Sequence, residues 1–406
     1  VVAEIAVSLA LLVGAGLLLR TFHKMRHAEI GIESQNVLTM GISLPDTKYG
    51  TPVARRQFFD RLLARLRSAP GIQVASASTL IPLEGGSNGY ITVPGRDDGA
   101  IKNQLFEYNY VTQDYFRAFG IPLLRGRNFS SRDEDQAAQV AVKISEVFST
   151  PNRPADALKD HSWTAIINRS MANLVWPNQD PIGRTFVIGG ALPVTVIGVV
   201  GDVKVWGIRR GGAPQAYFPF PGALAGRGSR QLVVKTAGPP MMLLGAIRSH
   251  VNALDPTLAV ILPRTMEDVI SDGMSDTSLQ TWLLSVFAAL AVLLASVGLY
   301  SVMAFLVSQR RHEIGIRMAL GARGTDLLRL VFAHALKLIG IGVLAGIVAA
   351  LWLTRLIQSL LFGVAANDVP TFAAVSILLT IVALAACCFP AWRAMRVNPI
   401  VALRYE

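Results

Sequence analysis

Charged side chains are scarce in this sequence. They make up 16% of the 406 residues, whereas hydrophobic residues make up 52%. Because soluble domains carry about one quarter charged residues, part of the chain is expected to face lipid. The high apolar content excludes an intrinsically disordered chain. The sequence has only two cysteines, the neighbours Cys387 and Cys388, which excludes a disulfide-stapled secreted scaffold.

Four stretches lack charge over a length that suits a membrane helix: Ile5–Leu19, Trp282–Val307, Leu338–Thr354 and Val369–Trp392. A helix needs about 20 apolar residues to cross a bilayer core, and the third stretch reaches this length if the stem of Lys337 snorkels. We therefore predict transmembrane helices at 1–20, about 282–307, 332–354 and 370–391, with the chain beginning inside the first. A cleaved signal peptide is disfavoured, because Glu4 precedes the first stretch and Arg20 follows it.

Arginine is unevenly distributed between the connecting segments. The loop 308–329 and the tail after Trp392 are rich in arginine, whereas 358–368 has neither lysine nor arginine. The positive-inside rule therefore places the loop and the tail in the cytoplasm and the large segment 21–280 outside. Arg20, Lys24 and Arg26 then lie on the unexpected side, which long translocated domains tolerate.

The large segment has the pattern of a folded α+β domain. Strand-like, helical and strand-like stretches follow one another at 37–44, 52–67 and 72–80, and again at 231–236, 240–254 and 258–262. We predict that these two β-α-β units pair into an outer lobe, 30–84 plus 229–272. The segment 85–228 is predicted to form a strand-rich lobe inserted into the outer one. The predicted fold is thus an α/β membrane protein with one helix, a two-lobed extracytoplasmic domain (21–280) and a three-helix permease domain (281–406).

Shorter patterns lie within the inserted segment. Tyr115–Phe119 and Arg169–Val175 favour short helices, and 194–200 with 203–207 favours a hairpin around Gly201-Asp202. The acidic run 133–135, which follows Ser130-Ser131, is expected to be a solvated turn.

Motifs for catalysis and cofactor binding are missing. The sequence contains no phosphate-binding Gly-x-x-x-x-Gly-Lys-Ser/Thr, no Gly-x-Ser-x-Gly and no His-Glu-x-x-His pattern. His23 and His27 have the spacing of metal ligands but no third ligand beside them, which favours a polar interface. From residue 20 to 280 the sequence has 28 basic and 22 acidic residues, a net charge of +6 that is scattered and forms no basic stripe of the kind that binds nucleic acid. We predict no enzyme activity, no metal, no cofactor and no nucleic-acid partner.

The predicted membrane helices contain few ionisable residues. A proton-coupled carrier usually places a carboxylate at mid-depth, and the second and fourth helices have none, which disfavours a secondary carrier. Gly342 and Gly346 form a small-x-x-x-small pair in the third helix, a pattern that permits close packing against another helix.

The arginine-rich loop has helical periodicity. Arg310, Glu313 and Arg317 share one face at i, i+3 and i+7, and Ile314 and Met318 form an apolar stripe beside them. The periodicity alone allows two interpretations: an interface helix that only orients the protein, or a docking helix for a cytoplasmic protein.

The loop and the tail resemble the cytoplasmic signature of FtsX/MacB-type permeases of ABC transport systems. The matching residues are Arg311, Glu313–Arg317, Ala319–Ala322, Pro390-Ala391, Pro399 and Ala402–Arg404. The stretches Leu12–Arg20, Trp176-Pro177, Asp180–Arg184 and Val196–Asp202 are similar to a subgroup with two tandem permease halves in one chain (ADOP-like permeases), of which this would be the second half. The chain departs from the family at 136–162, where extra polar sequence is inserted.

The resemblance implies a permease subunit of an ABC-type export or mechanotransmission system in the bacterial plasma (inner) membrane. It implies these partners: a cytoplasmic ABC ATPase dimer that hydrolyses ATP, a second permease half, membrane lipid, and a periplasmic adaptor or cell-envelope enzyme. The implied ATPase-coupling helix comprises Arg310, Arg311, Glu313, Ile314, Gly315, Ile316, Arg317, Met318, Leu320 and Gly321. The alternative is a membrane scaffold that controls extracytoplasmic enzymes, as FtsX-like relatives control cell-wall hydrolases.

Overall fold

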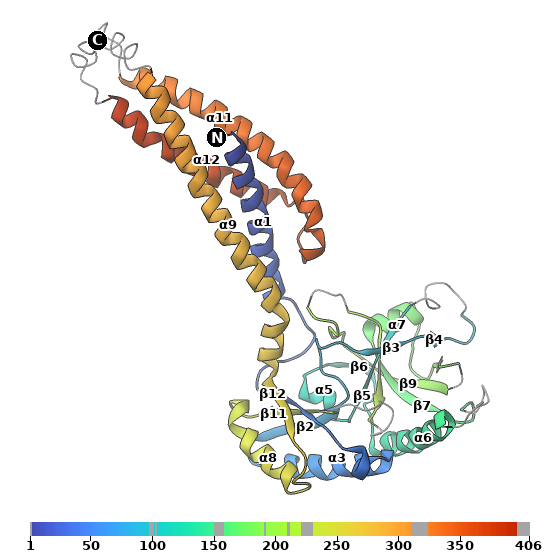
Figure 1. Ribbon diagram of the computed structural model, residues 1–406. Helices are drawn as coiled ribbons and strands as arrows, with labels where there is room; N and C mark the ends of the chain where they lie inside the picture. Colours follow the sequence, from blue (N-terminus) through green and yellow to red (C-terminus); the bar gives the residue numbers. More distant parts are fainter. Residues whose placement is uncertain are drawn as a thin grey trace, which may run out of the picture. The chain divides into compact units, whose positions relative to one another are not determined.

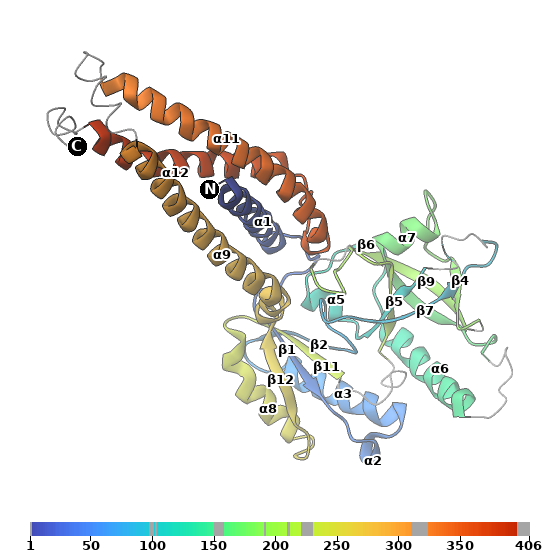
Figure 2. The ribbon, with the colours of Figure 1, turned by 45° about the horizontal axis from the view of Figure 1, so that its top comes forward.

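The computed structural model describes residues 2–96, 101, 104–149, 158–190, 192–208, 212–220, 230–309 and 324–395. The chain forms two units: a membrane unit of residues 1–27 and 274–406, and a sheet unit of residues 28–273. Figures 1 and 2 show their elements from two directions.

The membrane unit is helical. Its long helices are α1 (Val2–Arg26), α9 (Met266–Gln309), α11 (Gly324–Leu356) and α12 (Val369–Met395), with the short η2 (Gln358–Leu360) between the last two. Within the described residues, four stretches have the length and composition to cross a membrane: Val2–Arg26, Leu279–Val302, Leu336–Leu356 and Val369–Ala386. The predicted arrangement of one helix before the large domain and three after it is confirmed.

The sheet unit is built on one mixed sheet of twelve strands in the described residues. The order is β12 (Val260–Thr265), β1 (Val37–Ile42), β11 (Arg230–Thr236), β2 (Ile72–Ser78), β5 (Phe106–Val111), β10 (Gln215–Pro219), β7 (Trp163–Asn168), β9 (Leu192–Val200), β8 (Thr185–Ile188) and β4 (Ile91–Thr92). In addition, β3 (Ser87–Gly89) pairs with β5, and β6 (Leu123–Gly126) pairs with β9. The pairs β5–β10 and β7–β9 are parallel, and the others are antiparallel.

The two predicted β-α-β units occupy one end of this sheet. β1, α3 (Pro52–Arg67) and β2 form the first, and β11, η1 (Pro240–Leu243) with α8 (Leu244–Asn252), and β12 form the second. The remaining helices are α2 (Asp46–Tyr49), α5 (Tyr115–Ala118), α6 (Ser131–Ser149) and α7 (Arg169–Val175). The sheet runs without a break through both predicted lobes, because β2 of the outer lobe pairs with β5 of the inserted lobe.

The start of α3 follows from its sequence. The Thr51 side chain accepts a hydrogen bond from the Ala54 amide, and Pro52 occupies the first turn, where its missing amide hydrogen is not needed. Phe58, Leu62 and Leu66 then recur on one face and are buried against the sheet.

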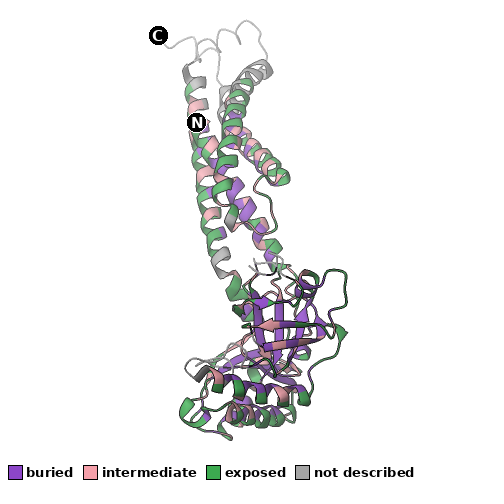
Figure 3. Cartoon of the chain, turned by 90° about the vertical axis from the view of Figure 1, so that its right-hand side faces the viewer, coloured by how far each residue is buried: buried purple, intermediate pink, exposed green. Residues whose placement is uncertain are grey.

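Side chains alternate along the strands between the two faces of the sheet, and Figure 3 shows how much of the sheet is buried. On one face, Leu38, Leu232 and Val234 pack with α3 and α8 in a core that we call the outer core. On the same face, Ala216 and Phe218 pack with α6 and α7 in a second, inserted core. On the opposite face lies a third core, the shared core, which draws on both predicted lobes and contains α5.

The predicted hairpin at 194–207 is wrong. β9 pairs with β7, β8 and β6, and residues 203–207 form no strand. The backbone of this segment bonds elsewhere: the Lys204 amide donates to the Ile30 carbonyl (3.1 Å), and the Lys204 carbonyl accepts from the Leu83 amide (3.1 Å). Gly201-Asp202 therefore ends a strand and does not reverse the chain onto it.

The acidic run is also not a solvated turn; it lies in the first turn of α6. Asp133 is 4% exposed and accepts two hydrogen bonds from the Arg127 guanidinium (2.7 and 2.9 Å) and one from the Ser130 amide (2.8 Å). Acidic residues are favoured at helix N-termini. The sequence that departs from the family thus begins as an amphipathic helix, whose buried side includes Ala137, Val140 and Ile144.

Candidate functional site

The predicted coupling helix lies outside the described residues. The ten residues assigned to it lie within 310–321, between the end of α9 at Gln309 and the start of α11 at Gly324. The docking role of this segment stays a prediction. The described part of the candidate site is the helix bundle to which the segment is joined.

Helix α1 packs closely against α11 through the glycines singled out in the sequence. A Cβ atom added to Gly342 would lie 2.8 Å from Ile5 Cβ, and one added to Gly346 would lie 2.8 Å from Leu9 Cβ. Real Cβ atoms do not approach so closely, so larger residues at either position would push the helices apart. In lipid, helices associate through such shape complementarity, because the tails around them are as apolar as the side chains.

Two glycines of α1 allow close approach of the other two helices, α9 and α12. A Cβ atom on Gly14 would lie 3.2 Å from Leu284 of α9, and one on Gly16 would lie 3.0 Å from Thr371 of α12. The Gly-Ala-Gly of the first apolar stretch therefore contains one contact of α1 with α9 and one with α12. α1 is the central helix of the bundle, in contact with all three others.

Helix α9 meets α1 along a narrow seam. Its buried residues Thr281, Ala288 and Ala295 recur every seven residues, the spacing of a coiled-coil seam. The Ser8 hydroxyl contacts the Ala291 carbonyl across this seam at 2.8 Å. Most other large side chains of α9 are exposed, among them Leu293 (60%) and Leu294 (64%), as expected for lipid-facing positions.

The C-terminal turns of α1 hold the segment between α11 and α12. Arg20 forms an ion pair with Asp368, Lys24 donates to the Gly363 carbonyl, and the Thr21 hydroxyl accepts from the Phe362 amide at 3.4 Å. The Thr371 hydroxyl, which donates to Asp368 at 2.6 Å, lowers the pKa of this carboxyl group, and Arg20 adds to the effect. Two of the three basic residues that the positive-inside rule leaves on the unexpected side, Arg20 and Lys24, thus have partners in the loop that lacks lysine and arginine.

Helix α9 begins in the sheet unit. Met266 and Val269 in its first turns are buried in the shared core, and the helix then continues without interruption to Gln309. One helix therefore connects the core of the sheet unit with the edge of the arginine-rich segment.

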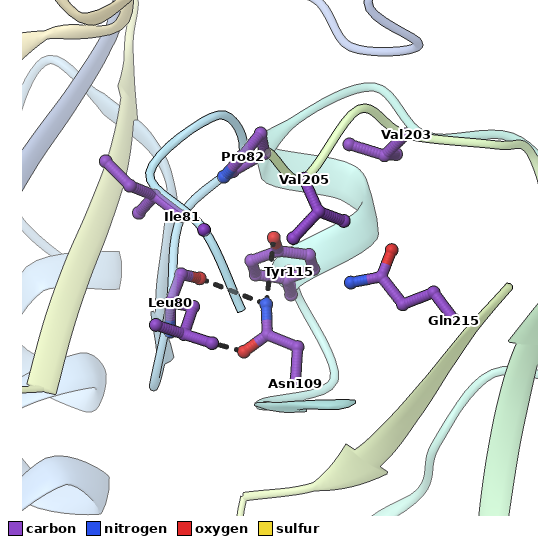
Figure 4. Close-up of a pocket in the computed structure, with 9 residues that line it drawn as sticks. Leu80, Ile81, Pro82, Asn109, Tyr115, Val203, Val205 and Gln215 are labelled. Carbon is purple, nitrogen blue, oxygen red and sulfur yellow. Dashed lines mark hydrogen bonds between the residues drawn. The ribbon is translucent and has the colours of Figure 1, made fainter. Parts of the chain in front are cut away.

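A small cavity lies in the sheet unit between β2, β5 and β10. It has a volume of about 10 Å³ and is lined by Leu80, Ile81, Pro82, Gly85, Asn109, Tyr115, Val203, Val205 and Gln215. Figure 4 shows Asn109 at its side, bonded to both backbone groups of Leu80 (3.2 and 3.0 Å) and to the Tyr115 hydroxyl (3.3 Å). The space suits a single water molecule, so this cavity is not a transport pocket.

Two family profiles match the chain. Residues 2–241 match the MacB-like periplasmic core domain, and residues 285–399 match the FtsX-like permease C-terminal domain. The first match alone covers more than half of the chain. The chain belongs to the FtsX/MacB-type permeases. The four apolar helices and the periplasmic core domain of this permease fit a membrane protein whose large domain is extracytoplasmic.

Curated relatives include export proteins with an ATP-binding part. The permease is 25% identical over 333 residues to the macrolide export ATP-binding/permease protein MacB 2 of Aeromonas hydrophila subsp. hydrophila, covering 79% of this chain and 46% of the relative. It is 28% identical over 314 residues to the corresponding MacB of Azoarcus sp., covering 73% and 42%. The chain thus spans less than half the length of these relatives.

A structural relative is the periplasmic region of MacB from Actinobacillus actinomycetemcomitans, at 15% identity and a TM-score of 0.36. The likeness covers 60% of this chain and 94% of that one.

Sequence reasoning missed the contacts at the end of α1. Arg20 and Lys24 were assigned only to topology, because nothing in a single sequence pairs them with residues 340 positions away. The charges of the two segments are complementary and could have indicated this contact. The segment 358–368 has Asp368 and neither lysine nor arginine, whereas the end of the first helix has Arg20 and Lys24.

Proposed function

We propose that this permease couples ATP hydrolysis on a separate cytoplasmic ATPase dimer to movement of its extracytoplasmic domain, as part of an ABC-type export or mechanotransmission system of the bacterial inner membrane. The observation that supports this most is the continuity of α9. A helix that starts at Met266 in the shared core and ends at Gln309 next to the arginine-rich segment is suited to carry a displacement from one to the other.

The narrow seam between α9 and α1 fits this role. Thr281, Ala288, Ala295 and the larger Leu299 are buried along α9, whereas other large residues of this helix, such as Leu293 and Leu294, are exposed. A helix held along one row of small side chains is less restrained than one interlocked on several sides, as α1 is. α1, clamped at Arg20 and Thr21, supplies the fixed reference in this proposal.

The ATPase would be engaged through Arg310–Gly321. Ile314 and Met318 supply an apolar anchor, and Arg310, Glu313 and Arg317 fix its orientation. The second permease half, fused or separate, would complete a pair of coupling helices for the ATPase dimer.

Co-purification in detergent with the ATPase encoded nearest to this chain tests the proposal. We expect wild type to retain the ATPase and Ile314→Asp and Arg317→Glu to lose it. Arg329→Glu, which makes the same charge change outside the docking residues, is the control and should retain it. Equal retention by wild type, Ile314→Asp and Arg317→Glu would refute the assignment of the docking helix.

A second candidate function has an observation of its own. Met242 (80% exposed) and Leu262 (71%) lie on the contacting elements η1 and β12, together with the half-exposed Met241 and Ile261. Exposed apolar clusters mark protein interaction sites. The cluster favours a scaffold that binds an extracytoplasmic adaptor or enzyme, and Leu262→Ser with Met242→Ser should then abolish the partner's binding while ATPase retention is unchanged.

A further inference from the structure

A buried glutamate in the sheet unit has only one of its two carboxylate oxygens bonded. Glu107 lies on β5 and is 5% exposed. Its Oε1 atom accepts a hydrogen bond from the Trp206 indole nitrogen at 2.7 Å. Its Oε2 atom is also buried and has no hydrogen-bond partner among the described residues. Burial of a carboxylate is costly unless other groups replace the water it loses, so Glu107 is only partly compensated.

The side chains beside Glu107 on the sheet are neutral. Glu107 lies next to Gln215 in the parallel pair of β5 and β10, and next to Asn88 in the antiparallel pair of β5 and β3. Two positions along β5, the amide group of Asn109 makes its hydrogen bonds to other residues, as Figure 4 shows. Within the part of the chain that the structure describes, Glu107 therefore has no counter-ion.

Two glycines cover the carboxylate. A Cβ atom added to Gly86 would lie 2.3 Å from Glu107 Oε2, and Gly86 is itself partly exposed, so this oxygen lies just beneath the surface. A Cβ atom on Gly85 would lie 2.8 Å from the ring of Trp206, and the φ of +96° at Gly85 is one that glycine adopts without strain. A side chain at either position would fill the approach to Glu107.

The cavity of Figure 4 borders the same segment. Gly85, Val205 and Gln215 are among its lining residues. The Gly85 amide donates to the Val205 carbonyl at 2.8 Å, which fixes the backbone between the cavity and the carboxylate. With a void beside Gly85 and solvent beside Gly86, a small shift of this backbone meets few side chains.

From these observations we infer that Glu107 is the anionic part of a binding site for a primary ammonium group, R–NH₃⁺. An ammonium group carries three N–H donors and a compact positive charge, so it supplies both the missing hydrogen bond and the missing counter-ion. A water molecule would supply only the hydrogen bond. The group belongs to a small amine or to a lysine side chain of a partner. The site goes beyond the proposed function and needs no ATPase.

The test follows Trp206 in the full chain in lipid nanodiscs without ATPase. The six tryptophans are replaced by 5-fluorotryptophan, and Trp206→Phe identifies the fluorine resonance of Trp206. We expect phenethylamine to shift this resonance with saturation, because the indole nitrogen shares the carboxylate with the ligand. Phenethyl alcohol, which has the same ring and no charge, should leave it unchanged. Acetyl-lysine-amide presents the ammonium group as a protein does, and its affinity relative to phenethylamine shows which source the site prefers.

Variants locate the binding at Glu107. Glu107→Gln keeps an oxygen for Trp206 and removes the charge, so it should weaken binding by at least about tenfold without lowering the thermal midpoint. Gly86→Ala keeps the carboxylate and places a methyl group against Oε2, and it should also weaken binding. Glu84→Gln, which removes an exposed carboxylate from the same segment, is the control and should bind as wild type does.

The site is overturned if neither amine shifts the Trp206 resonance, if the alcohol shifts it equally, or if Glu107→Gln retains the shift. If Glu107→Gln lowers the thermal midpoint, Gly86→Ala decides, and unchanged binding in that variant also overturns the site. Ile314→Asp should bind the amines as wild type does, so failure of the docking helix and failure of this site give different results.

Discussion

The membrane unit and the sheet unit are held together by opposite kinds of contact. In the membrane unit, glycines of one helix lie close against aliphatic side chains of another, as at Gly346 and Leu9. In the sheet unit the largest fully buried side chains are aromatic, and Tyr115, Phe58 and Phe59 are each 1% exposed. The membrane helices also leave large residues such as Leu294 exposed, which the sheet unit mostly avoids.

The difference follows from the solvent. Water drives large apolar side chains together, and their buried area supplies the stability of the sheet unit. Lipid provides no such drive, so the membrane helices depend on close backbone approach and on hydrogen bonds such as that of Ser8. The same substitution should therefore have different effects in the two units.

Truncation of a phenylalanine should show the largest contrast. Phe59 is 1% exposed and contacts Phe58 and Phe220 with ring centroids 5.4 and 5.2 Å apart. Phe59→Ala should lower the free energy of unfolding of the sheet unit by about 3–5 kcal/mol. Phe287→Ala on α9, where the side chain is 57% exposed, should change stability by less than about 0.5 kcal/mol. Thermal unfolding of the full chain in detergent measures both, and similar losses would contradict the comparison.

Replacing a glycine by a larger residue should destabilise the membrane unit, where glycines make the close helix contacts. Gly346→Val in α11 would force its side chain into Leu9 and should destabilise the membrane unit by about 1–3 kcal/mol. Gly340→Val in the same helix is the control, because a Cβ atom there meets nothing within 4 Å. Hydrogen exchange of α1 in nanodiscs measures the effect, and equal exchange in the two variants would mean that the close contact does not hold the bundle.

Local signals in the sequence predicted several elements correctly. α3 and α7 have the predicted bounds, 52–67 and 169–175, because a capping residue precedes each helix and a stop signal, Pro70-Gly71 or Trp176-Pro177, follows. The four membrane helices were predictable because an uncharged apolar stretch of about 20 residues is typical of a helix that crosses a bilayer.

Features that depend on distant partners were not predictable. Residues 203–207 have the pattern of a strand, but their backbone bonds to Ile30 and to residues 83–85. The acidic run looked solvated because nothing local indicated that Arg127 and Ser130 would bind Asp133. The central place of α1 in the bundle is visible only from the contacts of Gly14 and Gly16. No pattern in a single sequence assigns these contacts to particular helices.

Acid should weaken the start of α6. Burial opposes ionisation of Asp133, but hydrogen bonds from Arg127 and Ser130 outweigh it and lower the pKa of the carboxyl group to about 2. A carboxyl group with a lowered pKa stabilises the fold above its unfolded pKa of roughly 3.9, and this contribution is lost as the pH falls towards about 2. Asp133→Asn should therefore cost about 1–2 kcal/mol near neutral pH, after allowance for solvent screening.

The pH dependence distinguishes this effect from a packing defect. The stability difference between wild type and Asp133→Asn should shrink as the pH falls through the interval between the two pKa values. Hydrogen exchange of α6 in the full chain, followed against pH, measures it. A difference that stays constant with pH would show that the ionised carboxylate is not what holds the helix start.

The clamp at the end of α1 should show the smallest effect. Arg20 is 41% exposed at its side chain and pairs with Asp368, which the Thr371 amide (3.2 Å) and hydroxyl (2.6 Å) also bind. Because these two donors remain when Arg20 is replaced, Arg20→Gln should cost less than about 1 kcal/mol, and high salt should reduce the cost further.

Arg26→Gln, an exposed arginine in the last turn of the same helix, is the control with no expected change. Asp368→Ala should cost more than Arg20→Gln, because it removes the acceptor for the Thr371 amide and hydroxyl at the start of α12 as well as the ion pair. Thermal unfolding in nanodiscs at low and high salt gives this order, and a larger, salt-independent loss for Arg20→Gln would mean that the bundle depends on a charge pair as strongly as on its glycines.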